Sequence, residues 1–278
     1  MSASGHRTPA LATGLLLLGL LASVSLGSAL LSLDPLAIRT DQILSPPSLE
    51  HPLGTDQLGR DLLARLLAGG RPSFLAGLVA TGVALLLGVG LGTLASRSPV
   101  WIDVLLSRGT DLVYAFPALI GAMVLVGLPG EHPLMALPEG VRVGMIVGLF
   151  SWPMLFRFVR VEVRRRLDSD GHLAALAAGA GPVRTLVLHL LPDALAPALV
   201  PASFIAGGTI LLEAALGFLG LGVRPPEPSW GNLLRDGMTH VDSAWWMVLF
   251  PGLVVFLAVL AFQLIGEGLG RQRAEELY

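Results

Sequence analysis

Long apolar runs dominate the sequence and predict helices that cross a lipid bilayer. A helix needs about 20 predominantly apolar residues to span the hydrocarbon core of a membrane. Six runs are candidates, at residues 10–33, 73–96, 112–130, 140–160, 194–223 and 243–265. The fourth and fifth contain charges, and the other four contain none. The pattern therefore predicts an all-α polytopic membrane protein with six transmembrane helices.

The first of these runs could alternatively be a secretory signal peptide. The apolar part of a signal peptide is about 7–15 residues long. The run at residues 10–33 is longer and is followed by five more candidate spans. We therefore interpret residues 1–33 as an N-terminal tail and the first transmembrane helix.

Composition supports a lipid environment and excludes several activities. The 278 residues are 53% hydrophobic and 14% charged, whereas soluble proteins average about 25% charged residues. The net charge is -2 and no long basic stretch exists, so we expect no nucleic-acid partner. All 18 basic residues are arginines, and a P-loop needs a lysine. This chain therefore hydrolyses no nucleotide through a P-loop of its own.

The distribution of arginines predicts the orientation in the membrane. An even number of spans places both termini on one side, and cytoplasmic loops carry an excess of basic residues. The densest arginine cluster lies between the fourth and fifth spans, at residues 157–184. Residues 34–72 carry four arginines but also five acidic residues. We predict that both termini are cytoplasmic, that residues 34–72 are extracytoplasmic, and that residues 73–278 form the membrane-embedded core.

The extracytoplasmic segment predicts a short amphipathic helix. Five leucines between residues 58 and 67 share one helical face, with Thr55 or Asp56 as the N-cap and Gly69-Gly70 as the stop. Such a helix is expected to lie flat on the outer membrane surface. His51, Asp56 and Asp61 could alternatively bind a metal, although turns and caps already explain both aspartates.

The loop at residues 161–193 predicts two short helices joined by a turn. Arg157, Arg160 and Arg164 fall at helical spacing, so the fourth span should continue into the cytoplasm with a basic stripe. A helix at residues 172–178 should then be closed by Gly179 in a left-handed conformation.

The second short helix should start at Pro182, which suits a first helical turn, and run to Leu191, where Pro192 breaks it. The loop is unusually apolar, because Leu173, Ala174 and Ala175 lie outside the bilayer. Exposed apolar surface of this kind indicates a protein partner. The alternative is that it packs beneath the chain's own spans.

These residues carry a family resemblance. The run Leu173-Ala174-Ala175 with Gly179 and Pro192 resembles the E-A-A loop of ABC-transporter permeases that work with an extracytoplasmic binding protein. Further matches to the dipeptide, oligopeptide and nickel subfamily are His51-Pro52-Leu53-Gly54-Thr55-Asp56, Gly59-Arg60-Asp61, Ala115-Phe116-Pro117, Ser151-Trp152-Pro153, Phe218-Leu219-Gly220-Leu221-Gly222-Val223, Pro228-Ser229-Trp230-Gly231-Asn232 and Phe250-Pro251-Gly252.

The resemblance implies a type I ABC importer permease in a bacterial inner membrane, similar to the second of two permease subunits. It implies a heterodimer with a sister permease, two ATP-binding subunits that carry ATP and Mg, and an extracytoplasmic substrate-binding protein. This chain would need no cofactor and catalyse no reaction, and its cargo would be peptides or nickel chelates. Leu173 replaces the glutamate usual in the family, which removes one polar contact from the expected coupling site at Leu173, Ala174, Ala175, Gly179, Pro182 and Pro192.

Glu213 is the one charge deep in an apolar run, and intramembrane carboxylates indicate function because their burial is costly. It could line the substrate pathway and meet a substrate amine or cation, or it could anchor helix packing. An ion-driven secondary carrier that uses Glu213 is the alternative function, although the sequence shows no internal repeat. A membrane-embedded enzyme is disfavoured because the chain has no cysteine, no H-E-x-x-H and no G-x-S-x-G.

Overall fold

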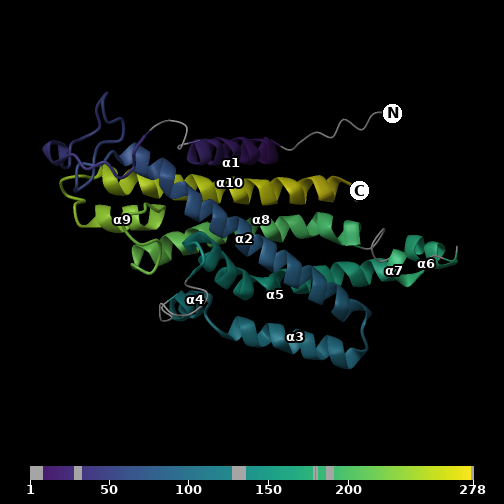
Figure 1. Ribbon diagram of the computed structural model, residues 1–278. Helices are drawn as coiled ribbons and strands as arrows, with labels where there is room; N and C mark the ends of the chain where they lie inside the picture. Colours follow the sequence, from purple (N-terminus) through teal and green to yellow (C-terminus); the bar gives the residue numbers. More distant parts are fainter. Residues whose placement is uncertain are drawn as a thin grey trace.

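The structure is a computed structural model that describes residues 9–27, 33–126, 136–177, 179, 181–185 and 191–276. This part of the chain is built from helices and contains no strand (Figure 1). The elements are α1 (Pro9–Gly27), the 3-10 helix η1 (Thr40–Gln42), α2 (Leu62–Arg97), α3 (Val100–Ala115), α4 (Ala118–Val126), α5 (Glu139–Leu167), α6 (Asp170–Ala177), α7 (Pro182–Thr185), α8 (Leu191–Phe218), α9 (Trp230–Met238) and α10 (Trp246–Glu276).

Four of the described helices, α2, α5, α8 and α10, are long and apolar enough to cross a membrane. The shorter apolar helix α1 lies along α10, as Figure 1 shows. Gly14 of α1 packs against Ala261 and Ile265, whereas Leu11 packs against Gly268, so the two helices are antiparallel. The prediction of a multi-pass helical membrane protein is confirmed.

Helices α2 and α5 pack closely along their lengths, and small residues make this possible. Gly140, Gly144 and Gly148 of α5 follow a four-residue spacing and face α2. A Cβ on Gly140 would lie 2.6 Å from the carbonyl oxygen of Pro72, and one on Gly148 would lie 2.8 Å from that of Ala80. Glycines at this spacing let membrane helices approach closely. The constant offset between contacting residues shows that α2 and α5 run parallel.

Helix α8 packs antiparallel to both α2 and α10. Ser73, near the start of α2, bonds to Glu213 near the end of α8. Gly207 of α8 packs against Phe262 of α10. Helix α8 ends at Phe218, and Gly220 then adopts a φ of +82°, so the end of the predicted run at residues 194–223 is a turn rather than helix.

The predicted interfacial helix is wrong: four of its five leucines, from Leu62 to Leu67, belong to the first turns of α2, and Leu58 precedes that helix. The N-cap is Asp61, whose Oδ1 accepts the Ala64 amide at 2.9 Å, and not Thr55 or Asp56. The helix continues through Gly69-Gly70 to Arg97. Leu62 and Leu66 are buried under α9, where Trp230 donates its indole N–H to the Leu66 carbonyl oxygen at 2.9 Å. Leu62 and Leu66 therefore pack against protein.

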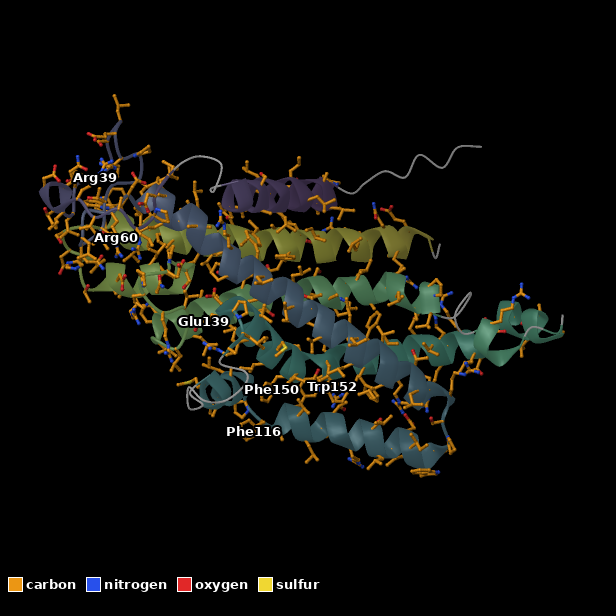
Figure 2. All side chains as sticks on the ribbon, viewed as in Figure 1. Arg39, Arg60, Phe116, Glu139, Phe150 and Trp152 are labelled. Atoms are coloured by element: carbon orange, nitrogen blue, oxygen red, sulfur yellow. The ribbon has the colours of Figure 1, made fainter. Side chains whose placement is uncertain are left out.

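The predicted span at residues 112–130 is interrupted. Helix α3 begins earlier, at Val100, and ends at Ala115, and α4 starts at Ala118. Pro117 causes the break, because proline disfavours helical backbone in the preceding residue, and Phe116 is extended with φ -94° and ψ 122°. The Phe116 ring stacks on Phe150 of α5 with centroids 6.4 Å apart (Figure 2). Residues 127–130 lie outside the described residues.

Two opposite ends of the bundle carry the non-spanning segments (Figure 1). Residues 33–61 and α9 lie at one end, which we call the outer end. Helices α6 and α7 lie at the other, the inner end, together with the start of α1 and the end of α10. Arg273 of α10 contacts Glu162 of α5 at 3.1 Å there, which agrees with this placement.

Candidate functional site

The segment that the sequence predicts to contact a partner projects from the inner end of the bundle. We call its described residues, 170–177, 179 and 181–185, the inner arm. Helix α6 begins at Asp170, directly after a short link from α5, and the Leu173 amide donates to the Ser169 carbonyl oxygen at 3.1 Å. Leu173 is 54% exposed and Ala174 is exposed. Ala175 lies on α6, and its side chain lies outside the described residues.

Gly179 turns the chain between the two short helices. Its φ is +83°, as the sequence predicts, and a Cβ at this position would meet nothing within 4 Å. The glycine is therefore required by backbone conformation and not by lack of space. A substitution at Gly179 should therefore change the backbone conformation of the inner arm without a steric clash.

Pro182 begins α7, as predicted, and the buried Thr185 donates its hydroxyl to the Gly181 carbonyl oxygen at 3.0 Å. The predicted continuation of this helix through residues 186–190 lies outside the described residues. Pro192 lies on α8, whose described part starts at Leu191. Because residues 186–190 lie outside the described residues, the helix end predicted at Pro192 stays a prediction.

The arginine stripe of α5 faces another helix of the same chain. Arg160 donates two hydrogen bonds to Asp103 of α3, and Arg164 donates one to the same carboxylate at 2.8 Å. One turn away, Arg157 contacts Asp111 at 2.7 Å. The stripe predicted to run into the cytoplasm therefore ties α5 to α3.

Asp103 sits at the centre of this cluster, with its side chain 7% exposed. The guanidinium groups of Arg160 and Arg164 balance the negative charge of this carboxylate. Its position in the first turn of α3 also favours a negative charge.

A second acidic centre on α5 ties that helix to α10. Glu162 is 13% exposed and accepts hydrogen bonds from Arg166 at 3.3 Å and Arg165 at 3.4 Å. Arg273 of α10 adds a third at 3.1 Å. Asp103 and Glu162 together clamp the inner end of α5 between α3 and α10, just before the inner arm starts.

Glu213 is buried in the bundle near its outer end, with 1% of its surface exposed. Its Oε2 accepts a hydrogen bond from the Ser73 hydroxyl at 2.5 Å. The other oxygen, Oε1, makes no hydrogen bond to the part of the chain that the structure describes. The carboxylate therefore links α8 to α2 through Oε2, and Oε1 is available to accept a hydrogen bond.

The residues considered for a metal site have structural partners instead. His51 Nδ1 lies 2.7 Å from Asp61 Oδ2, and its Nε2 lies 2.7 Å from Gln42 Oε1. Asp56 bonds to Arg60 at 2.7 Å and contacts Arg65 at 3.4 Å. No group of three potential ligands occurs among the described residues. Hydrogen bonds and ion pairs that stabilise the outer loop and the start of α2 account for these side chains.

Comparison with known proteins decides the family. Residues 84–273 match the family model described as "Binding-protein-dependent transport system inner membrane component". The matched region includes α5, the inner arm, α8 and most of α10. The chain belongs to this family. It is accordingly a transport permease component and a multi-pass protein of the bacterial inner membrane, not a catalytic subunit.

Several relatives are transport proteins for short peptides. The chain is 39% identical over 242 residues to the di/tripeptide transport system permease protein of Pseudomonas aeruginosa, covering 85% of this chain and 78% of the relative. It is 40% identical over 226 residues to the dipeptide transport system permease protein of Alkalihalophilus pseudofirmus, covering 81% and 72%. The Escherichia coli dipeptide permease protein is 36% identical over 235 residues, with coverage of 82% and 76%.

Sequence reasoning missed two features of the site. The arginine stripe was visible, but its partner Asp103 lies 57 residues away along the chain. The glycine repeat on α5 was also visible as a four-residue spacing, and this signal alone could have indicated a close helix pair.

Proposed function

We propose that this chain is the transmembrane subunit of an ATP-driven importer of short peptides. The observation that carries the proposal is the inner arm, an exposed apolar helix and turn on a chain related to peptide permeases. The partners are a sister permease, two ATP-binding subunits that hold ATP and Mg, and an extracytoplasmic substrate-binding protein. ATP chemistry belongs to the partners because this chain has no lysine for a P-loop.

The proposed topology has six spans with both termini in the cytoplasm. The spans are α1, α2, the broken pair α3 and α4, α5, α8 and α10. The alternating directions of the packed helices support it, because α8 is antiparallel to α2 and α10, and α1 is antiparallel to α10. The inner arm then faces the cytoplasm and residues 34–61 face the opposite side.

The proposed coupling works through the rigid inner end of α5. The apolar surface at Leu173 and Ala174 docks on an ATP-binding subunit, with apolar contact in place of the ionic contact that a glutamate would make. When nucleotide draws those subunits together, the inner arm moves with them. Asp103 and Glu162 hold α5 against α3 and α10, so the motion reaches three helices at once.

We propose that Glu213 belongs to the peptide pathway. The hydrogen bond from Ser73 occupies Oε2, and Oε1, which has no hydrogen-bond partner among the described residues, is able to accept a bond from a peptide ammonium group. Desolvated carboxylates bind such cations strongly. If Glu213 instead anchors α2 to α8, removal of its charge should disrupt the assembled complex rather than uptake alone.

Reconstitution with the proposed partners tests the function. Proteoliposomes that contain the assembled complex should take up a dipeptide only with ATP and the binding protein, whatever the ion gradient. A partner variant without its P-loop lysine serves as the inactive control. Uptake by this chain alone, driven by a proton or sodium gradient, would instead support the secondary carrier. Uptake that requires neither ATP nor the binding protein would contradict the proposal.

A further inference from the structure

A hollow of about 490 Å³ opens at the outer end of the bundle. It lies between the first turns of α2, the start of α5 and the connection between α8 and α9. Figure 2 shows Glu139, one of its lining residues, at the outer end of α5. Its volume falls in the range of about 300–1,000 Å³ typical of sites for small ligands.

Charged side chains of both signs line this hollow. Arg71 of α2 and Arg224 of the connection supply guanidinium groups, and Glu139 and Glu227 supply carboxylates. Arg71, Arg224 and Glu227 are exposed, whereas the Glu139 side chain is 17% exposed. A hollow with both signs suits a ligand that itself carries both charges.

The carboxylate of Glu139 fixes the walls of the hollow relative to each other. Its Oε1 accepts a hydrogen bond from Arg142 at 2.7 Å, and its Oε2 accepts the Arg224 amide at 3.3 Å. The second bond joins α5 to the connection after α8. Pro72, Pro138 and Pro228 also line the hollow and restrict the backbone there. Because these walls are already held in place, less conformational entropy is lost when a ligand binds.

We propose that this hollow is a subsite for a short zwitterionic peptide, entered after release from the binding protein. The inference rests on the proposed function and adds a location and a set of contacts to it. Arg71 and Arg224 bind the peptide carboxylate, because the guanidinium fork matches a carboxylate in geometry and charge. Glu227 binds the peptide ammonium group, and Glu139 adds negative potential behind it.

The size of the hollow favours a peptide over a loop of the binding protein. A stable protein interface buries about 800 Å² on each partner, whereas a hollow of this volume encloses a small molecule. Pro72 lines the hollow, and Ser73, the next residue of α2, bonds to Glu213. The proposed subsite therefore lies close along α2 to the residue proposed for the peptide pathway.

Cysteine protection in the assembled transporter tests the proposal. The chain has no native cysteine, so Ala68→Cys or Leu75→Cys places a single thiol in this chain, on the wall of the hollow. Dipeptide delivered by the binding protein should slow labelling by a small thiol reagent about tenfold when peptide is at ten times its Kd. Leu49→Cys, fully exposed on the outer loop, is the control that should label at an unchanged rate.

Charge variants then identify the contacts. Arg224→Gln should weaken peptide affinity about tenfold, the loss expected for one charged hydrogen bond, so that the slowing of labelling falls from about tenfold to about twofold. Arg39→Gln, an exposed outer arginine outside the hollow, is the matched control and should leave protection unchanged. An N-acetylated dipeptide with a free carboxylate should protect less than the parent, and Glu227→Gln should remove that difference.

Three outcomes overturn the inference, and they are distinguishable from one another. Equal protection by the binding protein without peptide would make the hollow a docking surface for that protein. Normal ATP-driven uptake without protection of either cysteine would reject the subsite and leave the proposed function standing. Absence of ATP-driven peptide uptake in the unmodified complex would reject both.

Discussion

Gly179→Val perturbs the inner arm through backbone conformation alone. Gly179 has a φ of +83°, and a Cβ there would meet nothing within 4 Å, so no clash adds to the conformational cost. That cost is about 1–2 kcal/mol for a residue with a Cβ, with β-branched residues the least tolerant. A factor of ten in an equilibrium corresponds to about 1.4 kcal/mol. The native turn should therefore become about 5- to 30-fold less favourable.

If docking on the ATP-binding subunits requires this turn, their affinity for the chain should fall by a similar factor. The assay compares binding-protein-stimulated ATP hydrolysis with peptide uptake in the same proteoliposomes, and both should fall together. Membrane insertion should be unchanged, because the apolar runs that direct it are untouched. Co-purification of the ATP-binding subunits measures docking directly.

Two variants separate backbone conformation from general disruption. Gly181→Val makes the same change two residues later, where the glycine is exposed and φ lies outside the left-handed region, and should cause little loss. Gly179→Asn should retain most activity, because asparagine tolerates a left-handed conformation. Unaltered uptake and stimulated hydrolysis in Gly179→Val would refute the coupling role of the inner arm.

Three further predictions follow from the fold. Single cysteines at Ser169 and Leu49 should be labelled from opposite sides of the membrane, and same-sided labelling would contradict the six-span topology. Asp103→Asn should weaken the clamp between α3 and α5 by about 1–2 kcal/mol at neutral pH and lower the thermal unfolding temperature of the complex, with the exposed Asp168→Asn as the control that leaves it unchanged. Glu213→Gln should reduce peptide uptake while the complex still assembles, whereas loss of the assembled complex would favour the anchoring role.

Features encoded locally were predictable from the sequence. Gly179 follows an alanine-rich helix, and a glycine after such a segment is a strong signal for a left-handed helix end. The apolar runs at α2 and α10 are long enough to fix their environment without any tertiary contact. Local pattern therefore predicted the helix and turn of the inner arm and most of the membrane helices.

Features that depend on distant partners were not predictable in this way. The leucines at the start of α2 have the spacing of an interfacial helix, but α9 covers them through Trp230, whose position no local pattern reports. The stripe that includes Arg160 looks solvent-facing until Asp103 is placed opposite it.

The central claim is that the inner arm docks on an ATP-binding subunit, and a site-specific cross-link tests it most directly. Leu173→Cys puts the only cysteine of this chain on the exposed face of α6. In the assembled complex, a short cross-linker with a thiol-reactive end and a photoreactive end should join this residue to an ATP-binding subunit and block stimulated hydrolysis, whereas Leu49→Cys should do neither. Absence of this cross-link in a complex that transports peptide, or a cross-link to the extracytoplasmic binding protein, would contradict the account.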